Sequence, residues 1–393
     1  MSVARKIAGE LVEASWIRRM FEEGARLKAE RGADKVFDFT LGNPEVEPPE
    51  GLIAALREVV AENRPRTHGY MPNAGFLEVR EVVARRMAAR TGLPYTAEHI
   101  LMTVGSAGAM NVALKAILDP GDEVIVLVPY FPEYRFYIEN HAGRMVRVET
   151  DERFQPDVGL IAAAITPRTK AIIVNSPNNP TGALYSAQTL REIGNLLERH
   201  PQVLVLSDEP YRALVFDGKK APEVPPLVRR TLVADSWSKA LAVPGERIGC
   251  LAISPLIEDW AALRDAVTFA NRVLGFVNAP ALWQWAIARA PETTVDVGLY
   301  QAKRDLLCDA LTRMGYQVSR PAGAFYAFPR TPIADDVAFI RVLLKEGILA
   351  VPGSGFGRPG HIRLSLTVAT ETIRASLPGF ERALGAATLP AVN

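Results

Sequence analysis

The sequence predicts an α/β protein: a large domain with a mostly parallel sheet of the seven-stranded type between helices, and a smaller α+β domain. Three observations predict this architecture. The chain has 393 residues, a length that favours two domains over one core. Short apolar runs alternate with helix-length segments over residues 45–285. Beyond residue 285 the alternation stops, and a long helix leads into short strand-like segments.

Five apolar runs predict strands of the large sheet. They are rich in β-branched residues and do not alternate with polar ones, which is typical of strands buried on both faces of a parallel sheet. Helical stretches such as residues 186–200 lie between them, as crossover connections require. The runs are HILMTV (99–104), DEVIVLVP (122–129), AIIVNSP (171–177), VLVLSDE (203–209) and TLVADSW (231–237).

The smaller domain is predicted from residues 1–44 together with residues 286–393, and the large domain from residues 45–285. Helices are expected over about 293–314 and 334–347. The N-terminal segment places apolar residues at helical spacing, which predicts an amphipathic helix that packs with the small domain. These apolar residues are Ile7, Leu11, Ala14 and Ile17.

Composition excludes several classes of function. The net charge of +1 gives no field that would attract nucleic acid or an anionic membrane. No apolar run approaches the roughly 20 residues of a membrane span. The five histidines and two distant cysteines form no metal-ligand cluster, and two such cysteines fit a reducing cytosol. We therefore expect a cytoplasmic protein with no metal site.

Polar segments follow four of the strand runs. Because parallel strands end at one edge of their sheet, where α/β proteins bind ligands, these segments predict a single cleft. They are residues 105–118, 175–182, 207–211 and 236–239. The segment GFGRPG (355–360) matches a dinucleotide-binding fingerprint, but it precedes a strand-like run instead of a helix. We therefore expect it to be an ordinary loop.

In their order and spacing, three motifs resemble the class I aminotransferases of the pyridoxal-phosphate enzymes of fold type I. The motifs are NNPTG (178–182), SDEPY (207–211) and SWSKALAVPGERIG (236–249), and the resemblance extends from LGNPE at 41 to HIRLSL at 361. It implies a transaminase that moves an amino group from an α-amino acid to a 2-oxo acid by a ping-pong route. Pyridoxal 5'-phosphate would be the cofactor, attached to a lysine as an aldimine, in a homodimer.

The resemblance makes Lys239 the lysine that attaches the cofactor and acts as nucleophile and general base. Nearby cations lower the proton affinity of such an amine, which suits both roles. Asp208 would face the pyridine nitrogen and keep the ring protonated, so that the ring accepts electrons from the substrate carbanion. Tyr211 and Asn179 would hydrogen-bond the phenolate oxygen of the cofactor.

The cofactor phosphate needs hydrogen-bond donors and positive charge. The resemblance assigns the backbone N–H groups of Ser106 and Ala107, at the start of a helix, to this task. The side chains of Ser236, Ser238 and Arg247 would add hydroxyls and a fixed cation.

Two aromatic positions complete the implied cofactor site. Phe131 matches the residue that stacks on the cofactor ring, although the neighbouring Tyr130 remains an alternative. Tyr70 matches a tyrosine that reaches the phosphate of the other subunit, so each site would need both chains of the homodimer.

Arg363 matches the small-domain arginine that holds the α-carboxylate of the substrate, with help from Asn179 and the backbone of Gly42. Closure of the small domain would then exclude water. The sequence does not identify the side chain of the substrate. Arg272 lies near the region that would contact this side chain, but it is also interpreted as an ordinary exposed arginine.

Two other functions remain open from the sequence. The same cofactor site supports a β-lyase, which product analysis would distinguish from a transaminase. An aminotransferase-like domain can also serve as a ligand sensor, but such regulators carry an extra DNA-binding segment.

Overall fold

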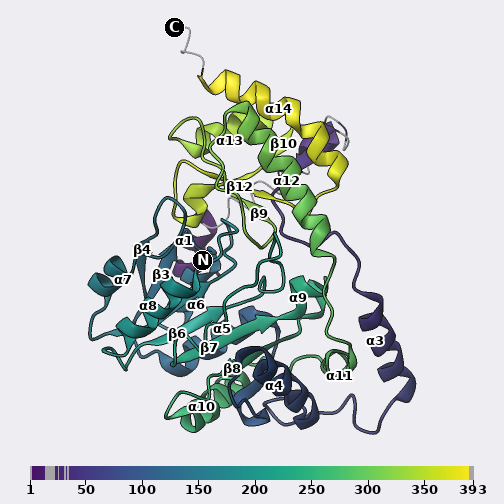
Figure 1. Cartoon of the computed structure of the whole chain (residues 1–393), viewed down its shortest axis with the longest axis vertical. Coiled ribbons are helices and arrows are strands. Elements are labelled where there is room, and N and C mark those ends of the chain that lie inside the picture. Colours follow the sequence, from purple (N-terminus) through teal and green to yellow (C-terminus); the bar gives the residue numbers. More distant parts are fainter. Residues whose placement is uncertain (1, 14–22, 25, 31, 33–34, 389–393) are drawn as a thin grey trace.

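The computed structural model describes residues 2–13, 23–24, 26–30, 32 and 35–388, and Figure 1 shows their arrangement. A seven-stranded sheet forms the centre, in the spatial order β2-β8-β7-β6-β5-β3-β4. Every strand pairing is parallel except those of β8, which runs antiparallel to both neighbours. The strands are β2 (Ile100–Thr103), β3 (Glu123–Val128), β4 (Arg144–Glu149), β5 (Thr169–Asn175), β6 (Leu204–Asp208), β7 (Thr231–Ser236) and β8 (Gly249–Ile253).

The predicted fold class is confirmed, and all five predicted runs form strands of this sheet. The sequence reading missed β4 and β8. The segment of β4, RMVRVE, mixes charged and apolar residues, and only one of its six residues is buried, because the strand lies at the edge of the sheet. Strand β8 begins two residues after Arg247, at the end of the motif 236–249, and none of the five predicted runs covers it.

Helices cover both faces of the sheet. Successive residues of β3 illustrate this: Val124 and Val126 pack with α5 and α10, whereas Ile125 and Leu127 pack with α7 and α8. Helices α3, α4 and α11 cover the other end of the sheet around β2 and β8. The bounds are α3 (Glu50–Glu62), α4 (Leu77–Thr91), α5 (Gly105–Ile117), α6 (Glu133–Asn140), α7 (Val158–Ala164), α8 (Ala187–Leu197), α9 (Trp237–Ala240), α10 (Trp260–Val273) and α11 (Ala281–Arg289).

The C-terminal part builds a separate core above one edge of this sheet (Figure 1). A three-stranded antiparallel sheet, in the order β11-β12-β9, packs with three helices, and β1 pairs with β10 in parallel. The elements are β1 (Phe37–Asp38), α12 (Val297–Met314), β9 (Tyr326–Ala327), α13 (Asp336–Lys345), β10 (Ile348–Leu349), β11 (Val351–Pro352), β12 (Ile362–Ser365) and α14 (Thr370–Thr388). The exact domain boundaries remain a prediction.

The expected N-terminal helix is present as α1 (Arg5–Glu13). The predicted positions Ala14 and Ile17 lie outside the described residues. Lys6 of α1 forms an ion pair with Glu139 of α6, at 3.7 Å, so α1 contacts a helix of the large domain, whereas the sequence predicted packing with the small domain.

Two further expectations concern other segments of the chain. In the segment 355–360, residues 355 and 356 end the short helix at Gly353–Phe356, and residues 357–360 form the expected loop, which leads to β12 and not to a helix. In the part of the chain that the structure describes, no helix combines the length and the apolar character needed to cross a membrane.

Candidate active site

A cavity of about 290 Å³ lies where β5, β6 and β7 end and the C-terminal core meets the central sheet. Segments that are far apart in the sequence converge on it. The twelve predicted site residues that line it are Gly42, Ser106, Ala107, Phe131, Asn179, Asp208, Tyr211, Ser236, Ser238, Lys239, Arg247 and Arg363. The cleft predicted from the strand ends therefore exists.

Lys239 lies in α9, the single helical turn that begins directly after β7. Its Nζ donates a hydrogen bond of 2.8 Å to the carbonyl oxygen of Gly42 and lies 5.6 Å from the ring centre of Phe325. The pKa of Lys239 is lowered to about 8, mainly by burial and in addition by the positive charges of Arg247 and Arg363. A substantial fraction of this amine is therefore neutral near physiological pH, as a nucleophile requires.

Asp208 is the last residue of β6 and is buried. One carboxylate oxygen, Oδ2, accepts a hydrogen bond of 2.5 Å from the hydroxyl of Tyr134, whereas Oδ1 is buried without a partner. The pKa of Asp208 is raised to about 7, mainly by burial. The hydrogen bond from Tyr134 and the Ser106 hydroxyl oppose this shift, whereas the negative charges of Asp235 and Glu209 add to it. An unpartnered buried acceptor is costly, so Oδ1 is suited to a donor on a bound ligand.

Asn179 and Tyr211 follow β5 and β6, respectively. The backbone N–H of Asn179 donates to Asn175 Oδ1 at 2.8 Å, which fixes the turn that contains Asn179. The hydroxyl of Tyr211 lies 3.2 Å from that of Tyr326. Burial raises the pKa of Tyr211 well above its usual value, so this hydroxyl stays protonated and can donate.

Arg363 enters the cavity from β12 and is buried. Its Nη1 donates to Asn179 Oδ1 at 3.2 Å, its Nη2 donates to the Thr40 carbonyl at 2.6 Å, and its Nε has no partner. The guanidinium lies 4.6 Å from the ring centre of Tyr326 and 4.9 Å from that of Phe356. These aromatic contacts fix the plane of a cation that still has a donor to offer.

A cradle of donors forms the opposite part of the cavity, at the N-terminus of α5. Gly105 begins this helix with a φ of +77°, and a Cβ atom there would lie 2.8 Å from Arg247 Nη2. Arg247 donates to the carbonyl of Pro244 at 2.9 Å and to that of Val104 at 3.3 Å. Ser106 and Ala107 follow in the first turn, so the helix N-terminus and the guanidinium together suit an anion.

Phe131 lines the cavity, and Tyr130 does not. The Tyr130 ring packs toward Gly357, where a Cβ atom would lie 2.7 Å from its Cε1. Phe131 contacts Tyr134 edge to face, with 5.6 Å between ring centres. Of the two aromatic candidates, Phe131 is the one placed to stack on a ring in this cavity.

Two candidates lie away from the cavity in the single chain. Tyr70 is 98% exposed. Arg272 is also exposed and lies over the ring of Phe269, at 5.3 Å. Neither residue lines the cavity.

Sequence reasoning missed several residues that line the cavity. Tyr134 is the most consequential, because it holds Asp208 Oδ2. The sequence contained a weak indication of this residue, because Tyr134 lies almost one helical turn after Phe131 and therefore on the same side of the chain. Tyr326 packs so closely that a Cβ atom on Gly42 would collide with its hydroxyl, which explains the glycine at position 42. The other missed lining residues are Thr40, Leu41, Tyr137, Asn175, Pro210 and Pro244.

Comparisons with known proteins identify the family of this chain. The model of the family "Aminotransferase class I and II" matches residues 34–377. The aspartate/prephenate aminotransferase of Thermus thermophilus is 38% identical over 366 residues, which is 91% of this chain and 93% of that protein. The aromatic-amino-acid aminotransferase 2 of Thermococcus litoralis is 30% identical, over 95% of this chain and 97% of that protein.

Solved structures give the same result. The crystal structure of an aminotransferase from Eubacterium rectale superposes with a TM-score of 0.95 at 36% identity, covering 99% of this chain and all of that one. The aspartate aminotransferase of Thermus thermophilus with maleate superposes with a TM-score of 0.86 at 32% identity, covering 98% of this chain and 100% of that one. This enzyme therefore belongs to the class I and II aminotransferases.

Proposed function

We propose that this aminotransferase holds pyridoxal 5'-phosphate in the cavity around Lys239. One observation carries the proposal: a buried carboxylate oxygen without a partner, Asp208 Oδ1, lines the same cavity as a buried lysine with a lowered pKa. The first suits the ring nitrogen of the cofactor and the second suits its aldehyde. When bound, the cofactor supplies an electron sink for the bond-breaking step at the substrate.

The other lining residues fit the remaining parts of the cofactor. Arg247 and the first turn of α5 would hold the phosphate, with Ser236 and Ser238 adding hydroxyls. Tyr211 and Asn179 would donate to the phenolate oxygen, and Phe131 would stack on the ring. The cavity thus offers a partner for each polar group of this cofactor.

Lys239 would also move the proton during amino transfer. In its neutral form the amine would accept the proton from the α-carbon of the substrate, and as the ammonium it would deliver this proton on the opposite side of the transferred nitrogen. Its pKa of about 8 lies close to physiological pH, where an amine serves well both as a base and as an acid.

Arg363 would bind the α-carboxylate of the amino acid and of the 2-oxo acid. Its Nε is available, and its contacts with Tyr326 and Phe356 hold the plane of the guanidinium. Since Arg363 belongs to the C-terminal core, substrate binding would draw this core toward the central sheet and exclude water.

The names of the relatives above refer to aspartate, prephenate and aromatic amino acids as substrates. A screen of amino acids against 2-oxoglutarate and pyruvate would identify the substrates of this chain.

The charge of Asp208 gives a first test. Asp208→Asn keeps the shape but removes the negative charge opposite the ring nitrogen. We expect the rate of proton abstraction in single turnovers to fall by about 10²–10³-fold, as for removal of one preorganised electrostatic group. Substrate affinity should change much less, and Asp208→Ala should be similarly slow. Parent-like single-turnover rates in both variants would remove Asp208 from the ring nitrogen.

We also propose a homodimer in which Tyr70 reaches the phosphate of the partner's site. A tyrosine that is 98% exposed in the single chain is available for this contact.

We also propose a cytosolic enzyme. Both cysteines are buried and unpaired, which supports this proposal.

Mixing two inactive variants tests the shared site. A dimer of one Lys239→Ala chain and one Tyr70→Ala chain has one site with both defects and one intact site. After subunit exchange in equal amounts, half of the dimers are mixed. The mixture should therefore recover roughly a quarter of the parent specific activity. Activity assays before and after exchange, with mass spectrometry to prove the exchange, measure this. A fully exchanged mixture without activity contradicts a site shared between chains.

A further inference from the structure

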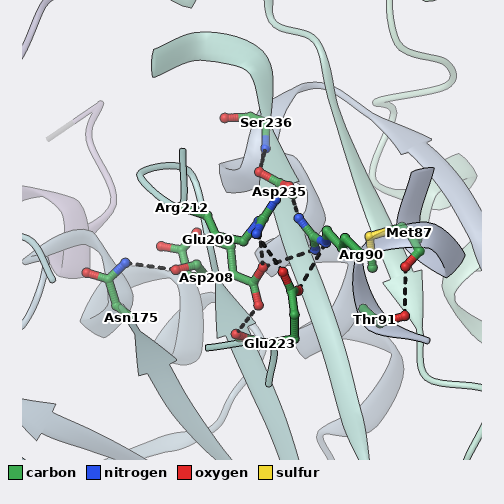
Figure 2. Close-up of polar contacts among 11 residues, drawn as sticks. Met87, Arg90, Thr91, Asn175, Asp208, Glu209, Arg212, Glu223, Asp235 and Ser236 are labelled. Atoms are coloured by element: carbon green, nitrogen blue, oxygen red, sulfur yellow. Dashed lines mark hydrogen bonds and ion pairs between the residues drawn. The ribbon is translucent and has the colours of Figure 1, made fainter. Parts of the chain in front are cut away.

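A cluster of five charged side chains lies directly behind the active-site strands (Figure 2). It contains three carboxylates and two guanidiniums and sits beside the ends of β6 and β7. Its members are Arg90, Glu209, Arg212, Glu223 and Asp235, and we refer to them as the ionic cluster. None of the sequence motifs discussed above assigned a role to this cluster.

Arg90, in the last turn of α4, is the centre of the ionic cluster. Its Nε lies 3.1 Å from Glu223 Oε2, its Nη2 lies 3.2 Å from Glu209 Oε2, and its Nη1 lies 3.6 Å from Asp235 Oδ2. The side chain is only 17% exposed. Arg212 completes the cluster with a contact of 2.6 Å to Glu223. One guanidinium thus engages three carboxylates from three segments of the chain.

Two of these carboxylates adjoin active-site residues in the sequence. Glu209 follows Asp208, and its Oε1 accepts a hydrogen bond of 2.7 Å from Ser207. Asp235 precedes Ser236, and its Oδ1 accepts from the backbone N–H of Ser236 at 2.7 Å. Since Ser236 leads directly into the turn with Lys239, Arg90 connects the chain at Asp208 to the chain at Lys239.

We propose that Arg90 is a positioning residue for amino transfer: it fixes the ends of β6 and β7 and balances the negative charge behind Asp208. The inference rests on the proposed contact between Asp208 and the cofactor ring. Arg90 touches neither the cavity nor any group that would react. It acts through Glu209 and Asp235.

The charge balance has a definite direction. Glu209 and Asp235 both raise the pKa of Asp208, in addition to the effect of burial. Without Arg90, three carboxylates would face one guanidinium, and Asp208 would take up a proton at higher pH. A neutral Asp208 cannot hold a protonated ring nitrogen. Other polar groups also interact electrostatically with Asp208, namely Ser106, Tyr134, Tyr137 and Tyr211. Tyr95 and Cys250 interact in the same way with Arg90.

Opposite charge changes in the holoenzyme test this proposal. In Arg90→Met, the pH at which dialysis removes half of the cofactor should rise by about one unit, and the acidic limb of the kcat profile should move with it. In Glu209→Gln, which removes a negative charge beside Asp208, both should move to lower pH. The double variant restores the net charge of the cluster and should return toward the parent profile, and Arg90→Lys should shift less than Arg90→Met.

Arg304→Met is the matched structural control. Arg304 lies in α12 and its side chain is 1% exposed. It forms a bidentate ion pair with Asp217, with contacts of 2.7 and 2.8 Å. Its loss should lower Tm without moving either pH profile. Equal shifts in Arg90→Met and Arg304→Met, or shifts of the same sign in Arg90→Met and Glu209→Gln, would overturn the inference. If Arg90→Met does not fold, the other two variants decide. The pH of cofactor release and the acidic limb of the kcat profile should then move to lower pH in Glu209→Gln and slightly to higher pH in Arg90→Lys.

Asp208→Asn separates this inference from the proposed function. If Asp208→Asn keeps the cofactor with the pH dependence of the parent, the proposed role of Asp208 fails, and the role of Arg90 fails with it. If Asp208→Asn weakens cofactor retention but the Arg90 and Glu209 variants keep the parent profile, only the role of Arg90 is wrong.

Discussion

Replacing Lys239 with alanine is expected to lower kcat by about 10⁴–10⁶-fold, because the variant loses both the covalent attachment of the cofactor and the general base. Among the residues that line the cavity, Lys239 is the one lysine. Its replacement should not damage the fold. The side chain makes one hydrogen bond, to Gly42, and a buried amine with a lowered pKa gives little net stabilisation.

Three measurements check this prediction. Steady-state kinetics give kcat, and thermal unfolding should show a Tm close to that of the parent. Borohydride reduction followed by intact mass spectrometry should show the added cofactor mass in the parent and not in Lys239→Ala. Lys303→Ala is a matched control, because Lys303 is a buried lysine outside the cavity, paired with Glu45, and this variant should keep the added mass. A Lys239→Ala enzyme that turns over like the parent would refute the proposed function as a whole.

The parts of the fold that the sequence predicted are those with strong local signals. Five strands were found because each is an apolar run buried on both faces, for example β3, which is buried along its whole length. The cavity was found because parallel strands end at one edge, so polar residues after β5, β6 and β7 had to meet there. Edge strand β4 gave no such signal, because only one of its six residues is buried and charged residues interrupt its apolar ones.

Contacts between distant segments could not be predicted in this way. Tyr134 and Asp208 are 74 positions apart, and their hydrogen bond depends on how α6 lies over the sheet. Arg90 is 119 positions from Glu209, and nothing in the sequence of α4 distinguishes it from the neighbouring arginines of the same helix. The environment of Tyr70 depends, on our proposal, on a second chain. The sequence motifs therefore identified twelve of the residues that line the cavity, whereas other lining residues such as Tyr134 and Tyr326, and the contacts of all of them, follow from packing.

Replacing Arg363 with alanine is expected to lower kcat/KM for amino acids by about 10²–10⁴-fold. A guanidinium meets a planar carboxylate with two parallel hydrogen bonds, which a lysine cannot reproduce. Each such charge-assisted bond contributes about 1.5–3 kcal/mol. At about 1.4 kcal/mol for each factor of ten, the loss of both gives this range. Arg363→Lys should recover only part of the activity.

The control for Arg363 is a substrate without the carboxylate. Amines of matched side chain should be poor substrates of the parent and should lose little more in Arg363→Ala, because they never form the contact. Cofactor affinity should hardly change, whereas Arg247→Ala should weaken it, since Arg247 lies at the cradle formed by the N-terminus of α5. Arg363 also donates to Thr40 and Asn179, so a purely structural role is the competing explanation. Equal loss of activity on amines and amino acids would establish that structural role and exclude the carboxylate contact.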